Sequence, residues 1–354
     1  MKLKKAYLRD RINSQLINLL FKFCRFKHDG KILVKSMDGI GDVLVRSKLA
    51  EMIIEKYGKG NVVFLMKSQY KQLGEMLGYE VFGVPRKSEK NFFKRLKMMY
   101  EINKRYSPKK FINIEFGNDS IVANISAPEK IGPFDEYEMV SCYNKYYTQS
   151  FKFKKNYSYV MDKIKDIANN VLNYNLNVQE IMPNLTDIFK SCDKKQGVVI
   201  AVGSSARDKV CSPQRMKNYI LELNKYYPNE KIILVGNGNL QKEYAKKLIE
   251  YLPQLDIENM VDKTTLKEVF KIVANSILFV GFDSGLYNLC FTTKTKAIAL
   301  FKNPVGVFVH NAPWIKVIGP EKEPIDDFVD INYPNKEINN ILIETFKKAV
   351  EELR

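Results

Sequence analysis

Residues 32–42 read ILVKSMDGIGD. The three apolar residues that open this stretch are typical of a buried strand, and the amphipathic residues 43–57 that follow it indicate a helix. Gly39 and Gly41 lie between the two elements, where they allow a tight turn and a close approach of a ligand to the backbone. Asp42 then lies at the start of the helix, at the strand end where open α/β sheets bind ligands. A carboxylate there can accept a proton from a substrate hydroxyl, although Asp is also a favoured helix N-cap residue.

The same alternation of apolar runs and amphipathic stretches continues along the chain and sets the fold class. Strands are predicted at 32–34, 61–66, 81–82, 111–116, 198–202, 232–235, 277–281 and 297–301, and helices at 43–57, 69–77, 90–106, 213–227, 240–251, 265–275, 285–291 and 336–353. This alternation predicts an α/β fold with mostly parallel sheets and helices on both faces. The pattern breaks near Pro183 and restarts at Val198, which indicates two doubly wound halves with a cleft between them.

Four segments follow from this pattern. They are a basic amphipathic N-terminal helix at 1–30, an N-terminal domain at 31–185, a C-terminal domain at 196–335 and a C-terminal helix at 336–354. Residues 134–175, rich in Tyr, Asn and Lys, carry no assignable pattern.

The charge of the chain is concentrated in its first third. The 354 residues carry a formal net charge of +17, and residues 1–110 contain 26 Lys and Arg against 10 Asp and Glu. A field of this sign attracts polyanions such as nucleic acid, anionic lipid or a phosphorylated acceptor. The alternative is a Lys-rich surface that is simply well solvated.

Cysteine and histidine usage limits the chemistry. The five cysteines are far apart and form no CxxC pair, a pattern typical of reduced thiols in a cytoplasmic protein rather than of disulfides or a zinc site. Only His28 and His310 are present, so we expect no metal centre.

Residues 1–28 combine an apolar face with basic flanks. The apolar side chains recur every three or four residues, at Leu8, Ile12, Leu16, Leu19, Phe23 and Phe26. Such a helix either lies in a membrane interface beside anionic lipids or packs on the body of the protein. No apolar run approaches the ~20 residues that span a bilayer, and no secretory cleavage site is present.

Two loops in the C-terminal half have the residue types of a phosphate site. Residues 203–209, GSSARDK, follow a predicted strand and offer hydroxyls, backbone N–H groups and two cations to a diphosphate, although an ordinary polar loop has the same composition. Asp283, Ser284 and Gly285 begin a predicted helix, where backbone donors can bind phosphate or the side chains can simply cap the helix. Glu243 follows a glycine turn and is a candidate for binding ribose hydroxyls.

Taken together, these segments resemble glycosyltransferase family 9, the bacterial heptosyltransferases. The resemblance runs from about residue 31 to 320. It rests on SMDGIGDVL at 36–44, GSSARDK at 203–209 with Pro213 after it, DKTTL at 262–266, and FVGFDSGLYNL at 279–289 with IALF after it.

The resemblance implies a GT-B fold, in which two Rossmann-like domains face a cleft and the last helix packs back on the first domain. It implies inverting, metal-independent transfer of heptose from ADP-heptose to an anionic lipid-linked acceptor, a lipopolysaccharide or lipooligosaccharide core or a related surface glycan, without a cofactor. The enzyme would be cytoplasmic, with residues 1–28 available to contact the inner membrane and no nucleic-acid partner. By position, Asp42 would be the general base and Lys209 would stabilise the departing ADP. The implied donor-binding residues are Ser204, Ser205, Arg207, Glu243, Thr264, Asp283, Ser284, Gly285 and Asn288.

The sequence departs from the family pattern at three places. Asn288 stands where the family has histidine, and Ser284 stands where threonine is usual. Val210-Cys211-Ser212-Pro213 replaces the Trp-Pro pair after the lysine. Two alternatives therefore remain open: a transferase or epimerase of the same fold that uses a UDP- or GDP-sugar, and a non-catalytic protein that binds polyanions or membranes.

Overall fold

The computed structural model describes residues 2–190, 196–204, 206–304, 308–320 and 336–354. The chain forms two compact units. The first contains residues 1–157 and 161–182, and the second contains residues 158–160 and 183–354.

The first unit is built on a six-stranded parallel sheet. Its order is β3-β2-β1-β4-β5-β6. The strands are β1 (Ile32–Lys35), β2 (Val62–Lys67), β3 (Val81–Val84), β4 (Lys110–Asn113), β5 (Glu129–Pro133) and β6 (Gln149–Phe151). The central strand β1 is buried along its whole length, as expected for a parallel strand covered on both faces.

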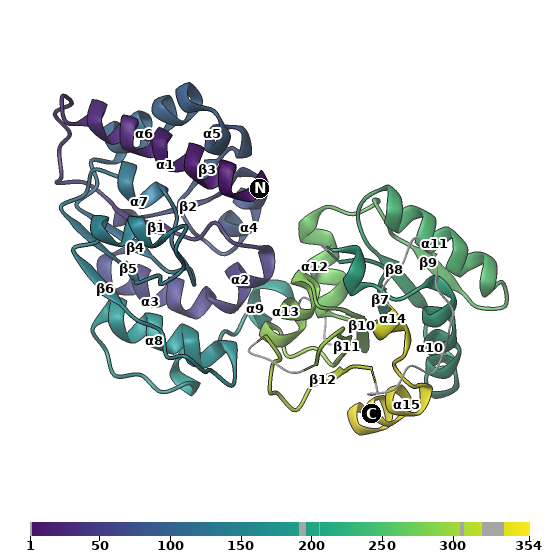
Figure 1. The fold of residues 1–354 in the computed structure, drawn as a ribbon. Coiled ribbons are helices and arrows are strands. Elements are labelled where there is room, and N and C mark those ends of the chain that lie inside the picture. The colour runs from purple at the N-terminus through teal and green to yellow at the C-terminus, as the bar shows by residue number, and fades with distance from the viewer. Residues whose placement is uncertain (1, 191–195, 205, 305–307, 321–335) are drawn as a thin grey trace. The chain divides into compact units, whose positions relative to one another are not determined.

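Helices cover both faces of this sheet (Figure 1). They are α1 (Lys2–Phe21), α2 (Ile40–Val45), α3 (Ser47–Tyr57), α4 (Lys71–Met76), α5 (Arg86–Lys90), α6 (Phe92–Tyr106), α7 (Ile121–Asn124) and α8 (Val160–Leu172). One core joins Ile17 and Phe21 of α1 to Ile102 of α6 and Leu33 of β1. In the part of the chain that the structure describes, no helix has the length and apolar character needed to cross a bilayer.

The second unit repeats the architecture. Its six parallel strands follow the order β12-β11-β10-β7-β8-β9. They are β7 (Val198–Ala201), β8 (Ile232–Val235), β9 (Ile257–Asn259), β10 (Leu278–Phe282), β11 (Ala297–Leu300) and β12 (Ile315–Ile318). The helices are α9 (Thr186–Phe189), α10 (Pro213–Tyr226), α11 (Asn239–Tyr251), α12 (Leu266–Ala274), α13 (Gly285–Thr292), α14 (Lys336–Asn339) and α15 (Ile343–Leu353).

These findings confirm the predicted fold class, two doubly wound α/β halves with parallel sheets. Some predicted elements differ in detail. The helix predicted at 43–57 is interrupted at Arg46, where α2 ends and α3 begins. The predicted strand at 111–116 ends at Asn113, because the backbone N–H of Glu115 donates its hydrogen bond to the side chain of Asn113 rather than to a neighbouring strand. Strands β5, β6, β9 and β12 were not predicted, since each is short and contains exposed or partly buried residues.

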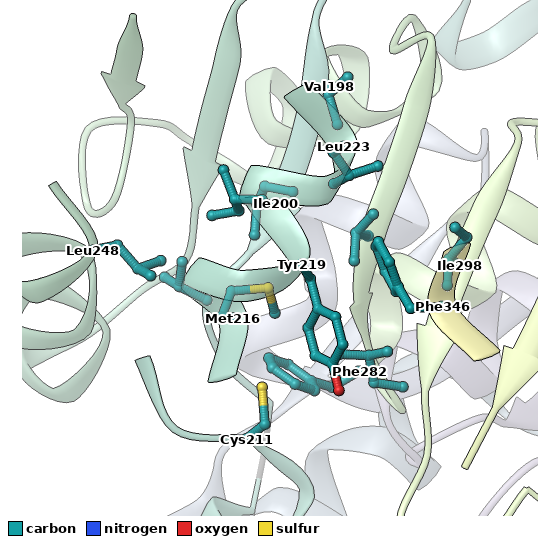
Figure 2. Packing of buried hydrophobic residues seen from close by; sticks show 14 of the residues in the cluster. Val198, Ile200, Cys211, Met216, Tyr219, Leu223, Leu248, Phe282, Ile298 and Phe346 are labelled. Carbon is teal, nitrogen blue, oxygen red and sulfur yellow. The ribbon is translucent and has the colours of Figure 1, made fainter. Parts of the chain in front are cut away.

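The C-terminal helix α15 belongs to the second unit, where it packs on α10, β11 and β12. Its buried residues include Phe346, whose ring lies 4.6 Å from that of Tyr219 (Figure 2). The physical reason for this packing is the apolar face of α15, which completes the core shared by Ile298 and Leu223. The expected packing of residues 336–354 on the N-terminal domain stays a prediction.

Because Phe346 is fully buried in this core, we expect Phe346→Ala to lower the free energy of unfolding of the second unit by about 3–5 kcal/mol. Trp314 is the only tryptophan in the chain and lies in the second unit, so its fluorescence in a urea titration reports this transition. Lys348→Ala, an exposed change on the same helix, is the control and should alter the value by less than about 0.5 kcal/mol. Equal effects of the two changes would contradict the placement of α15.

Candidate functional site

Asp42 closes the turn that Gly39 opens. The backbone N–H of Gly39 donates a hydrogen bond of 3.1 Å to Oδ2 of Asp42. A Cβ atom at Gly39 would lie only 3.2 Å from this oxygen, so glycine lets the turn close. Gly41 lies half-buried in the first turn of α2. Asp42 therefore caps its helix, and its second oxygen, Oδ1, lies 3.4 Å from Nη2 of Arg46.

Arg46 places a buried positive charge between two carboxylates. Its guanidinium is 1% exposed, forms an ion pair with Asp38, and stacks on the ring of Phe116 at 4.9 Å. Burial alone would raise the pKa of Asp38, but Arg46 and Lys35 outweigh it and hold that pKa below its usual value. At Asp42 burial prevails over Arg46 and raises the pKa above its usual value. The two carboxylates of one loop thus differ in how readily they accept a proton.

Lys35 links the ends of β1 and β4. Its Nζ forms ion pairs with Glu115 and, at 3.0 Å, with Asp119. The backbone N–H of Met37 donates a hydrogen bond to the other oxygen of Glu115. The lysine is buried, yet its two carboxylate partners raise its pKa and keep it charged. Neither Lys35 nor Glu115 was predicted as a site residue, and the available signal was a charged residue at the end of a buried strand.

A cavity of about 490 Å³ lies beside these ion pairs, and we refer to it as the N-terminal cavity. Helix α1 supplies Tyr7 and Arg9 to its wall, and the loops at the strand ends supply Asp38 and Asp119. Lys67, the last residue of β2, also lines it. Asp42 is not among the lining residues. No sequence pattern predicted this cavity, because it forms from segments that are distant in the chain.

In the second unit, the loops after β7 and β10 are joined at one edge of the sheet. Ser204 Oγ donates a hydrogen bond of 2.7 Å to the carbonyl of Asp283, and Lys209 Nζ lies 2.5 Å from Oδ2 of Asp283. Arg207 is exposed on the same loop. The structure therefore brings three predicted residues together, while Ser205 lies outside the described residues.

The start of α13 contains two buried polar atoms without partners. Ser284 is the N-cap residue, but its Oγ is buried and has no hydrogen-bond partner in the described structure. Gly285 is the first residue of the helix. Asn288 Nδ2 donates to the carbonyl of Ser284 at 3.0 Å, so its amide oxygen faces His310 Nε2 at 2.8 Å. The proton of His310 is therefore on Nε2, and the buried Nδ1 atom has no partner among the described residues.

His310 was not predicted as a site residue. Its ring stacks on Phe291 at 3.8 Å and on Tyr287 at 5.0 Å. Burial lowers its pKa from 6.5 to about 3, so the imidazole is neutral. Asn288 stands where the family has histidine, and in this chain the imidazole of His310, from a distant segment, lies next to Asn288 at the start of α13.

The glycine turn after β8 binds the carboxylate of Asp262, which was not predicted as a site residue. The backbone N–H of Gly238 donates a hydrogen bond of 2.6 Å to Oδ1 of Asp262, and Lys242 lies 2.8 Å from the other oxygen. Thr264 is half-buried two residues further on. Glu243, the predicted ribose-binding residue, is exposed on α11. Asp262 reaches the turn because β9 lies next to β8, and β9 was not predicted.

Asp42 belongs to the first unit and Lys209 to the second. Within the described residues, no group of three or more His, Cys, Asp or Glu side chains is arranged to hold a metal ion.

The model of glycosyltransferase family 9 (heptosyltransferase) matches residues 134–316, which are 183 of the 354 residues. Lipopolysaccharide heptosyltransferase 1 of Campylobacter coli is 23% identical over 293 residues, which cover 77% of this chain and 83% of that protein.

Two solved structures from E. coli share the fold. Heptosyltransferase WaaC with ADP-2-deoxy-2-fluoro heptose aligns with a TM-score of 0.71 at 15% identity, covering 92% of this chain and all of that one. ADP-heptose lps heptosyltransferase II aligns with a TM-score of 0.65 at 13% identity, covering 91% and 98%. At these identities the likeness supports the fold.

The neutral, buried His310 makes the stability of the second unit dependent on pH. Its folded pKa of about 3 lies below the unfolded value of 6.5, so its contribution is complete above pH 6.5 and is lost as the pH falls toward 3. The expected slope is about 1.4 kcal/mol per pH unit. We expect His310→Phe, which keeps the stacking on Phe291, to remove this slope from urea titrations followed by Trp314 fluorescence between pH 6.5 and 5. His28→Phe is the control, and an unchanged slope in His310→Phe would refute the assignment.

Proposed function

Because the chain belongs to glycosyltransferase family 9, the family of the heptosyltransferases, we propose that it transfers heptose from ADP-heptose to an anionic, lipid-linked glycan acceptor of the lipopolysaccharide or lipooligosaccharide type. The relative from Campylobacter coli is a lipopolysaccharide heptosyltransferase, which supports this acceptor class. The reaction would take place on the cytoplasmic side of the inner membrane.

The observation that carries the proposal is the contact of Lys209 with Asp283. It fixes a cation at the carboxyl ends of β7 and β10, which are neighbours in the sheet, and ligands of open α/β sheets bind at this edge. A diphosphate bound there would form ion pairs with Lys209 and Arg207 and would accept a hydrogen bond from the hydroxyl of Ser284, which has no other partner in the described structure. The unpartnered Nδ1 of His310 is an acceptor for a hydroxyl of the donor sugar.

The nucleoside of the donor would lie at the next strand ends along the sheet. Asp262 is held by Gly238 and Lys242 beside the glycine turn, and we propose that this carboxylate, rather than Glu243 alone, positions the ribose. Thr264 follows it in the same turn and would contact the base.

The proposed reaction is a single displacement at the anomeric carbon. The acceptor hydroxyl loses its proton to Asp42 as its oxygen forms a bond to that carbon, and the bond from the carbon to the diphosphate oxygen breaks. ADP leaves with the bonding electron pair, and attack from the opposite side inverts the anomeric configuration. Lys209 stabilises the negative charge that develops on the leaving diphosphate. The chain supplies this charge itself, so the proposed step needs no divalent cation.

The environment of Asp42 suits a general base. Burial raises its pKa toward the working pH, which strengthens it as a base, while Arg46 at 3.4 Å keeps the ionised form accessible. Asp38 is less suited to the role, because its ion pair with Arg46 holds its pKa low.

We expect Asp42→Asn to lower kcat for transfer by about 10²–10⁴-fold while calorimetry shows unchanged ADP binding, since asparagine can still cap the turn but cannot accept the proton. In the wild-type protein, kcat should fall as the pH drops through a pKa that lies above the usual Asp value. Glu55→Gln, an exposed change on α3, serves as the matched control, and a chelator should leave turnover unaltered. Full turnover by Asp42→Asn would remove this residue as the base.

We expect Lys209→Ala to weaken ADP binding roughly 10–100-fold, because a charge-assisted contact is lost and Asp283 is left to repel the diphosphate. The measurement is calorimetry with ADP, UDP, GDP and CMP, and Lys246→Ala, exposed on α11, is the control. Selective binding of UDP or GDP would replace the donor in the proposal. No binding of any nucleotide would favour a non-catalytic protein.

A further inference from the structure

Helix α1 has two apolar faces, and only one of them is covered. Ile17 and Phe21 on the inner face are buried in the core of the first unit. On the outer face, five aliphatic side chains are between 44% and 58% exposed, and Phe23 just beyond the helix is 84% exposed. The five are Leu8, Ile12, Leu16, Leu19 and Leu20. An amphipathic helix on a globular protein normally has one apolar stripe, which faces the core. A second, exposed apolar stripe therefore indicates a binding surface.

Polar contacts fix which face of α1 points outward. Ser14 Oγ donates a hydrogen bond of 3.2 Å to the carbonyl of Ser120, and Asn124 Nδ2 donates one of 2.9 Å to the carbonyl of Ser14. Asp10 forms an ion pair of 2.5 Å with the buried Arg95. These contacts hold the inner face against α6 and α7, so the helix cannot rotate to bury its exposed leucines.

The exposed apolar face is bordered by positive charge. Arg9, Arg11, Lys22, Arg25 and Lys27 are all exposed. Residues 1–28 carry eight Lys and Arg against a single acidic residue, and that residue, Asp10, is engaged by Arg95. Apolar side chains that insert among lipid tails and cations that contact headgroups are the two attractions that hold a helix in a membrane interface.

We propose that this outer face of α1, with Phe23 and the bordering cations, docks on an anionic phospholipid bilayer. A second copy of the chain fits the face less well, because a symmetric contact would bring the same cations of both copies together. The proposal rests on the proposed function and adds a membrane-docking surface to it. It also implies that the lipid-linked acceptor approaches the N-terminal cavity. Tyr7 and Arg9 of α1 line the N-terminal cavity, so a docked helix would hold that cavity at the bilayer surface, where a lipid-linked acceptor is presented.

The test is sedimentation of the full chain with vesicles of phosphatidylethanolamine and phosphatidylglycerol, compared with vesicles of phosphatidylcholine alone. We expect binding to the anionic vesicles, weakened by salt, and roughly tenfold or greater loss in the triple variant Ile12→Glu, Leu16→Glu, Leu19→Glu. The matched control is Ile188→Glu, Ile249→Glu, Tyr251→Glu, which makes the same change in net charge at exposed apolar positions of the second unit and should bind as wild type. Circular dichroism establishes that each variant is folded.

Arg11→Glu with Lys22→Glu is a second variant that leaves the apolar face intact and should also lose binding to the anionic vesicles. Equal binding by the wild type and both α1 variants would overturn the proposal. So would self-association of the wild type in light scattering that the triple variant abolishes, together with absence of vesicle binding. Neither donor nor acceptor is present in the vesicle assay, so its outcome is separate from that of the proposed reaction.

Discussion

Parallel strand pairing is the constraint on which both halves of the molecule depend. Every strand pairing in the described residues is parallel, so all carboxyl ends of one sheet meet at the same edge. The loops that follow those ends are thereby crowded together, whatever their separation in sequence. In the second unit this crowding brings Lys209 to Asp283, and in the first it brings Lys35 to Glu115 and Asp119. The order of the strands in each sheet, more than any sequence motif, brings the candidate site residues together.

Crowding polar groups beside a buried sheet requires that their charges be balanced. Lys35 and Arg46 are almost inaccessible to solvent, and each is surrounded by two carboxylates that keep it charged. As a result, the carboxylates of Asp38 and Asp42 have pKa values shifted in opposite directions. Asp38 takes most of the pairing with Arg46, which leaves Asp42 with the raised pKa that suits a proton acceptor.

The sequence predicted what local patterns determine and missed what sheet order determines. The strand–loop–helix units around Asp42, Ser204 and Asp283 follow from apolar runs, glycines and helix caps, and all three appear in the structure, with the helix after Asp42 interrupted at Arg46. Asp262 and His310 were missed, because each reaches its site through a short strand or a segment with no periodicity of its own. The contacts of the last helix with α10, β11 and β12 were also not predicted, because an apolar face shows that a helix is buried but does not identify the surface that buries it.

The ion pair of Arg46 with Asp38 differs in one respect from that of Lys209 with Asp283. Arg46 is 1% exposed, whereas the side chains of Lys209 and Asp283 are each about one-third exposed, at 37% and 32%. Loss of one member of a buried pair strands a charge in the interior at a cost of about 3–5 kcal/mol, while an exposed pair contributes about 0–1 kcal/mol. Arg46 is the buried member of its pair, since Asp38 is 35% exposed, so during divergence this cost applies to the loss of the carboxylate partner of Arg46. Lys209 and Asp283 are free of that restraint, and any invariance they show would reflect selection on the ligand they bind.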